Sequence, residues 1–148
     1  MARRGALAAA VVAVVIAPSS AAQVGHLVVL SGSCNPKING AYDYAGLTAS
    51  GAPWFKKVGA DFFIYYDPDC SGKGFESAWI LDTGPPSSSA VKDLDGDGKC
   101  DVCGYFSSSS VGSLPFGVWT MWCDPDWTTA WISFYEQATT TPEPTTTT

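Results

Sequence analysis

Residues 118–135 have the sequence VWTMWCDPDWTTAWISFY, in which two runs of alternating side chains flank a Pro-containing turn. In a β-strand, successive side chains point to opposite faces, so each run would present two different surfaces. The second run would place Ala130, Ile132 and Phe134 on one surface, and Trp131, Ser133 and Tyr135 on the other. Both surfaces contain aromatic side chains. The pattern therefore fits either two-sided burial in a compact barrel or one buried face and one aromatic binding face.

Eight runs of this kind recur roughly every 10–13 residues, and turn-favouring residues separate them. The runs are enriched in β-branched and aromatic residues, which fit the pleated surface of a sheet. They are Leu27–Leu30, Ala41–Tyr44, Pro53–Val58, Phe62–Tyr66, Ala78–Leu81, Val102–Phe106, Val118–Cys123 and Ala130–Tyr135. No segment of helical length combines a 3.6-residue period with caps. The predicted fold class is therefore all-β: a small disulfide-stapled sandwich or barrel with little or no helix.

The length and charge of the chain exclude several classes of protein. Its 148 residues allow one domain rather than several. Eight Lys and Arg against 14 Asp and Glu give a net charge of −6. This balance argues against a nucleic-acid partner, which requires a basic surface. One His and three Glu leave few groups for general acid–base catalysis, so we do not expect an enzyme.

Residues 1–22 have the three-part pattern of a secretory signal peptide. Arg3 and Arg4 precede an uncharged run rich in Ala and Val, and small residues before Gln23 form a cleavage site. The alternative is a membrane anchor, but the uncharged run, 6–17, is shorter than the ~20 residues that span a bilayer. No second apolar run follows, so we expect a secreted or surface-exposed protein with no membrane attachment after cleavage.

The last twelve residues, 137–148, are rich in Thr and Pro and have no strand period. In a secreted protein this composition is typical of a disordered, O-glycosylated stalk, and the alternative is a plain flexible tail. The β-rich extracellular module is thus expected to comprise residues 23–136.

Five cysteines in that module predict disulfide bonds, because a signal peptide leads to an oxidising compartment. Four of the five can pair in about 15 ways. Cys100 and Cys103 form a Cys-x-x-Cys motif, for which redox or zinc chemistry is the less favoured alternative, since His26 is the only His. We expect two structural disulfides and one spare thiol, either Cys100 or Cys103.

The segment DLDGDGKCD, residues 93–101, is the strongest chemical signal in the chain. We call it the acidic loop. It is similar to the first half of the calcium loops of EF-hands, dockerins and thrombospondin type 3 repeats. The expected calcium ligands are the carboxylates of Asp93, Asp95, Asp97 and Asp101 and the backbone carbonyl of Lys99. Gly98 would permit the sharp turn on which these oxygens converge.

The acidic loop also departs from that pattern. Its twelfth position, normally a bidentate acid, is Gly104, and its flanks are not amphipathic helices. Calcium would therefore need a further acid, for which the candidates are Asp82, Asp124 and Asp126. The alternative is a solvated Asp/Gly turn that binds no metal.

Six tryptophans are many for a domain of this size. Most would fill the core, but exposed Trp and Tyr side chains on a sheet can stack on sugar rings. Trp127, in a turn-rich stretch, and Trp122 are the candidates for binding a ligand.

The ordered motifs of residues 34–135 resemble an uncharacterised, Cys-containing, β-rich extracellular module of unicellular algae and marine protists. They are Asn39-Gly40-x-Tyr42, Trp54-Phe55-Lys56, Ile64-Tyr65-Tyr66-Asp67, Trp79-Ile80-Leu81-Asp82, Asp93-Leu94-Asp95-Gly96-Asp97-Gly98-x-Cys100 and Pro115-x-Gly117-x-Trp119. The resemblance implies extracellular placement and brings no catalytic residues. It also implies the pairs Cys34–Cys123 and Cys70–Cys100, with Cys103 as the additional thiol.

Together these observations predict a secreted or cell-surface binding or adhesion module that calcium stabilises. Its partner would be a glycan or an extracellular matrix or surface protein. Two alternatives remain: a structural cell-covering protein without a discrete ligand, and, less favoured, a small secreted glycan hydrolase that uses Asp residues.

Overall fold

A computed structural model describes residues 26–138 of the chain. The predicted signal peptide, residues 1–22, lies outside this range, as does most of the predicted stalk. The last strand ends at Ala138, so Gln137 and Ala138 belong to the sheet rather than to the stalk. Within residues 26–138, no helix is long and apolar enough to cross a membrane.

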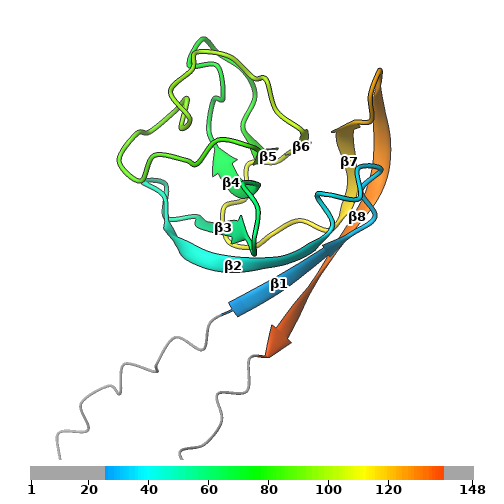
Figure 1. Cartoon of the computed structure of the whole chain (residues 1–148). Helices are drawn as coiled ribbons and strands as arrows, with labels where there is room; N and C mark the ends of the chain where they lie inside the picture. Colours follow the sequence, from blue (N-terminus) through cyan, green and yellow to red (C-terminus); the bar gives the residue numbers. More distant parts are fainter. Residues whose placement is uncertain (1–25, 139–148) are drawn as a thin grey trace, which may run out of the picture.

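Eight antiparallel strands, connected in sequence order, form a closed barrel (Figure 1). They are β1 (His26–Ser31), β2 (Gly40–Leu47), β3 (Pro53–Lys57), β4 (Phe63–Asp67), β5 (Ala78–Asp82), β6 (Gly104–Ser107), β7 (Gly117–Trp122) and β8 (Trp127–Ala138). Each strand pairs with the next, and β1 pairs with β8 from His26↔Ala138 to Ser31↔Ser133. The predicted all-β class is confirmed. Of the two expected architectures the barrel forms, because pairing of β1 with β8 leaves no open sheet edge.

Alternate side chains of the strands fill the barrel interior. Trp119, Met121 and Ile132 are fully buried there, whereas Val118 and Trp131 of the same two strands are exposed. The alternation predicted for residues 118–135 is therefore confirmed, with one buried and one exposed face.

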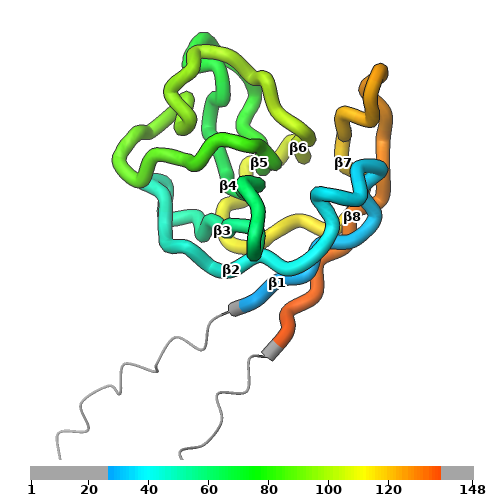
Figure 2. The backbone as a smooth tube through the Cα atoms, in the orientation of Figure 1, coloured from blue at the N-terminus to red at the C-terminus, as the bar shows by residue number. Residues whose placement is uncertain are grey.

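A second hydrophobic cluster lies outside the barrel wall, over β4 and β5. All five residues of each of these strands are buried, so both faces of this part of the sheet are covered. The long connections that follow β4 and β5 gather over it at one side of the barrel (Figure 2). Leu94, from the connection between β5 and β6, is buried in a cluster with Tyr65 and Ile80. This packing holds the acidic loop against the sheet.

Two disulfides cross-link the fold, Cys34–Cys123 and Cys70–Cys100, as the resemblance implied. They indicate an oxidising environment. Cys103 is the free thiol, which decides between the two candidates for that role. It is half-buried, and burial raises the pKa of the thiol to about 11.

Gly104, the first residue of β6, lies against β7 where no side chain fits. A Cβ atom at this position would overlap the Sδ atom of Met121 and approach the carbonyl oxygen of Thr120 to 3.2 Å. The residue that would be twelfth in a calcium loop thus packs against Met121 of β7, whose buried side chain would have to move to admit a larger residue.

The two disulfides are expected to stabilise the domain unequally. Cys34–Cys123 spans 89 residues and Cys70–Cys100 spans 30, so the first restricts the unfolded chain more. In the chain-entropy model, removal costs about 4–5 kcal/mol for the first and about 3–4 kcal/mol for the second. Urea unfolding of Cys34→Ser/Cys123→Ser and Cys70→Ser/Cys100→Ser measures both. A larger loss for the second pair would contradict this prediction.

Candidate metal centre and exposed aromatic face

The acidic loop is anchored to the barrel wall by a buried carboxylate, that of Asp67 at the end of β4. Asp67 is 1% exposed and accepts hydrogen bonds from the backbone N–H of Leu94 at 2.8 Å and of Asp69 at 2.9 Å. The N–H of Asp93 also donates to the carbonyl oxygen of Asp69 at 2.8 Å. Burial raises the pKa of Asp67, and these N–H donors oppose that rise. The loop is thus fixed at its start, next to the Cys70–Cys100 disulfide.

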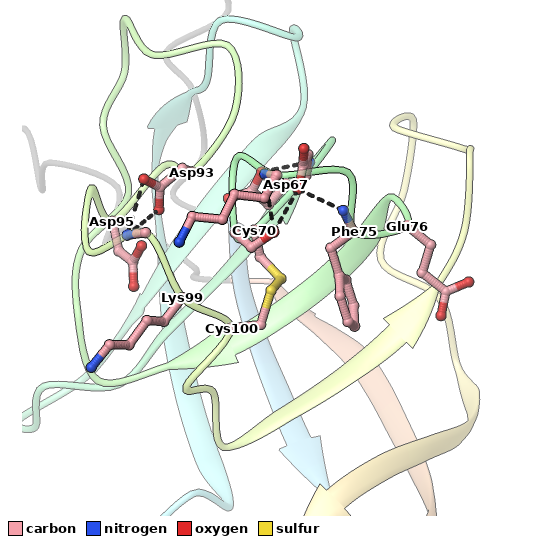
Figure 3. Close-up of a disulfide and its surroundings, with 12 residues drawn as sticks. Asp67, Cys70, Phe75, Glu76, Asp93, Asp95, Lys99 and Cys100 are labelled. Atoms are coloured by element: carbon pink, nitrogen blue, oxygen red, sulfur yellow. Dashed lines mark hydrogen bonds between the residues drawn. A yellow bond between two sulfur atoms is a disulfide. The ribbon is translucent and has the colours of Figure 1, made fainter.

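Three carboxylates converge within the acidic loop. One carboxylate oxygen from each of Asp93, Asp95 and Asp97 lies within 4.8 Å of the other two. Asp93 has a positive φ of 48°, and both of its carboxylate oxygens accept from the N–H of Gly98 at 3.1 Å. Asp93 and Asp95 lie on the same side of the disulfide (Figure 3). The chain thus folds back so that three of the five expected ligands converge.

Asp82, at the end of β5, is a fourth carboxylate beside this group. It is 4% exposed and accepts from the Tyr65 hydroxyl at 3.2 Å and from the N–H of Thr83 at 2.7 Å. Its Oδ2 atom and the Cβ atom of Asp95 each lie 3.7 Å from the position that a Cβ on Gly84 would take. Of the three further acids considered from the sequence, Asp82 is therefore the one beside the loop.

The remaining candidate ligands lie outside this group. Among residues 26–138, the carboxylates that converge to within 4.8 Å of one another are those of Asp93, Asp95 and Asp97, and Asp101 is not one of them. Asp101 is exposed and lies 3.9 Å from the ammonium group of Lys99. Asp124 and Asp126 lie in the turn between β7 and β8, where Asp124 is beside Cys34.

The electrostatics of the cluster favour a proton or a cation. Burial and the neighbouring charges of Asp97 and Asp82 raise the pKa of Asp95 to about 7. Burial also raises the pKa of Asp82. Crowded carboxylates of this kind form an all-oxygen site, which suits hard cations such as Ca²⁺.

A separate feature is an exposed aromatic surface on the outside of β7 and β8. Its large side chains are Trp122, Trp127, Trp131 and Tyr135, which are 41%, 45%, 63% and 57% exposed. Trp122 pairs with Trp127 across the two strands, and their ring centroids are 5.6 Å apart. The outward positions between these rings are Val118, Thr120, Thr129 and Ser133. We call this set the aromatic face.

The row of rings continues from the aromatic face toward the second hydrophobic cluster. The Tyr105 ring of β6 lies 6.0 Å from that of Trp127 and 6.2 Å from that of Phe75. The sequence had singled out Trp122 and Trp127, and the structure places both on this surface. It had not singled out Trp131 and Tyr135 as binding residues, although the alternation of residues 130–135 assigns them to one face.

Comparison with protein-family models, curated proteins and solved structures found no match to this chain. The resemblance to an algal and protist module therefore stays a prediction.

The raised pKa of Asp95 predicts how stability depends on pH when a chelator is present. Between the usual aspartate pKa of 3.8 and about 7, the folded protein keeps a proton that the unfolded chain has released. Stability should therefore fall as pH rises through this window. Thermal melts in EDTA from pH 4 to pH 8 measure the effect.

Asp95→Asn removes the titrating group and should flatten this dependence, so that the variant exceeds the wild type in melting temperature at pH 8. Asp101→Asn, at an exposed position of the same loop, is the control and should keep the wild-type profile. Equal profiles for the wild type and Asp95→Asn would contradict the prediction.

Proposed function

We propose that this domain is a secreted or cell-surface module that binds a neutral glycan through the aromatic face. The observation that carries the proposal is the composition of that face. Its outward side chains are aromatic, aliphatic or hydroxyl-bearing, and none of its positions is charged, although the chain has a net charge of −6.

A sugar ring needs two kinds of contact from a protein. Its C–H faces pack against aromatic rings, and its hydroxyl groups exchange hydrogen bonds with small polar side chains. Trp131 and Tyr135 offer exposed rings, and the hydroxyl groups of Thr129 and Ser133 lie at alternate positions between and beside them. Large apolar side chains that are exposed together on one surface favour an interaction site there.

The competing functions differ in what they would require of this face. A matrix or surface protein could also dock on exposed aromatic rings, since interfaces are enriched in Trp and Tyr. A structural cell-covering protein without a discrete ligand has no need of such a surface. We favour the glycan because the face combines hydroxyl groups with exposed rings, and none of the positions that define it carries a charge.

The oxidising environment that the two disulfides indicate agrees with secretion. The signal-peptide pattern of residues 1–22 also supports secretion, because such a segment directs a chain to the secretory pathway.

We further propose that Ca²⁺ binds between Asp93, Asp95, Asp97 and Asp82 and stabilises the acidic loop. Three converging carboxylates and a fourth buried beside them supply oxygen ligands, and the cation would relieve their mutual repulsion. The expected affinity is that of extracellular calcium modules, about 10⁻⁴–10⁻³ M.

Replacement of a central ring should weaken glycan binding without unfolding the domain. An immobilised panel of neutral glycans, with cellulose, chitin, xylan and mannan among the polymers, identifies the ligand. Trp131→Ala should then lower the affinity about tenfold, because one stacking contact is lost. Val91→Ala, at a similarly exposed position, is the control. Binding by charged glycans alone, or equal binding by both variants, would reject the proposal.

Calcium should raise the melting temperature of the wild type at pH 8. The rise should be much smaller at pH 5, because the proton that Asp95 then holds competes with the cation. Asp93→Asn should lose the calcium-dependent shift, and Asp101→Asn should keep it. A melting temperature that does not respond to millimolar calcium would sink this part of the proposal, and magnesium tests its selectivity.

A further inference from the structure

A pocket of about 360 Å³ lies at one end of the aromatic face, over the Cys34–Cys123 disulfide. We call it the disulfide pocket. Its walls come from the segment between β1 and β2 and from the end of β7. The lining residues are Cys34, Asn35, Pro36, Lys37, Trp122, Cys123 and Asp124. In Figure 1 these two segments lie beside each other at one end of the barrel, away from the acidic loop. Its volume is near the lower limit for small-molecule sites.

The disulfide pocket and the aromatic face share Trp122. This side chain lines the pocket, and its ring packs edge-to-face against that of Trp127. A ligand in the pocket would therefore touch the first ring of the aromatic row. A chain that left the pocket in that direction would lie along β8, where Trp131 is the next exposed ring on the same face.

Three polar side chains among the residues that line the pocket keep hydrogen-bonding groups with which they could bind a ligand. Among residues 26–138, neither Lys37 nor Asp124 forms an ion pair, although both line the pocket. The Oδ1 atom of Asn35 accepts the N–H of Lys37 at 3.1 Å, which leaves the amide NH₂ of Asn35 as a donor. The residues that line this one space thus carry an ammonium group, a carboxylate, an amide and an indole ring.

The backbone of the pocket is braced before any ligand arrives. The Asn39 side chain accepts the N–H of Ser33 at 2.9 Å and donates to its carbonyl oxygen at 3.1 Å. The disulfide joins this segment to β7, and the N–H of Cys123 donates to the carbonyl oxygen of Asp126 at 2.9 Å. A site that is rigid in the free protein loses little entropy when it binds.

We infer that the disulfide pocket is a subsite for the terminal pyranose ring of a neutral glycan whose next residues lie along the aromatic face. The inference rests on the proposed function and deepens it. The Trp122 ring stacks on the sugar, the Asp124 carboxylate accepts hydrogen bonds from adjacent hydroxyl groups, and Lys37 and Asn35 donate to hydroxyl oxygens. Lys37 and Asp124 carry opposite charges, so the lining as a whole has no net charge that would attract an acidic or a basic sugar over a neutral one.

A second copy of the chain fits this pocket less well than a sugar. The lining includes a cation, a carboxylate and an amide, whereas the core of a homodimer interface is mostly apolar and depleted of charge. Self-association is nevertheless one outcome that the experiment detects.

Methyl glycosides separate the pocket from the aromatic face, because one ring can fill the pocket but cannot reach along β8. Neutral methyl pyranosides are titrated into ¹⁵N-labelled protein, with glucuronic acid and glucosamine as charged probes, and the indole N–H signals are followed. One neutral glycoside should shift the Trp122 signal with a dissociation constant of about 1 mM, as expected for a ligand of this size. Lys37→Ala and Asp124→Ala should each weaken it at least about fivefold.

Matched variants provide the controls. Asp126→Ala alters the same turn outside the pocket, Lys73→Ala removes an exposed ammonium group elsewhere, and both should bind like the wild type. Trp131→Ala should leave the affinity for the methyl glycoside unchanged and should weaken only the binding of a hexasaccharide of the same sugar. The hexasaccharide should be weakened by the pocket variants as well.

The outcomes distinguish failure of the pocket from failure of the face. If Trp131→Ala weakens the hexasaccharide and the pocket variants change nothing, the proposed function stands and the pocket inference is overturned. If only charged probes shift Trp122, or if protein concentration alone shifts it through self-association, the inference is also overturned. If neither neutral glycosides nor glycan polymers bind, both ideas are rejected together.

Discussion

Pairing of β1 with β8 is the constraint on which the rest of the structure depends. It joins residues more than one hundred positions apart and turns an eight-stranded meander into a barrel without edges. β8 can close the barrel because it is long enough, at 12 residues, to pair with two strands. Its first half, Trp127–Ile132, pairs with β7, and its second half, Ser133–Ala138, pairs with β1. The strand that closes the barrel therefore also carries most of the aromatic face.

Closure of the barrel leaves β4 and β5 with a hydrophobic outer face that needs a cover. The connections that follow these strands supply it, held by the Cys70–Cys100 disulfide, by Leu94 and by the N–H groups that Asp67 accepts. Two buried carboxylates lie beneath this layer, Asp67 at the end of β4 and Asp82 at the end of β5, and burial raises the pKa of both, which favours their protonated forms. The acidic loop is thus built on top of a layer that a proton or cation would stabilise.

The strands and their inward faces were predictable from local pattern, because a period of two decides which side chains share a surface. Trp131 and Ile132 illustrate this, because they are adjacent in the chain and yet Ile132 is buried whereas Trp131 is 63% exposed. Spacing of carboxylates likewise predicted that Asp93, Asp95 and Asp97 converge, since a tight turn brings alternate residues together. Residue pattern alone left the disulfide pairing open, and only the resemblance implied which cysteines join.

By itself, then, the sequence determined the all-β class, the alternation within each strand and the acidic turn, all of which depend on residues within a few positions of one another. Tertiary structure alone decided the partners that come from distant segments. It placed Asp82, at the end of β5, beside Asp95 of the acidic loop. It also placed Lys37 and Asp124, from two distant connections, in the lining of one pocket. It also decided that the strands form a closed barrel rather than a sandwich of two sheets. The physical reason is that these contacts follow from strand register and barrel closure, which long-range pairing sets and no local period encodes.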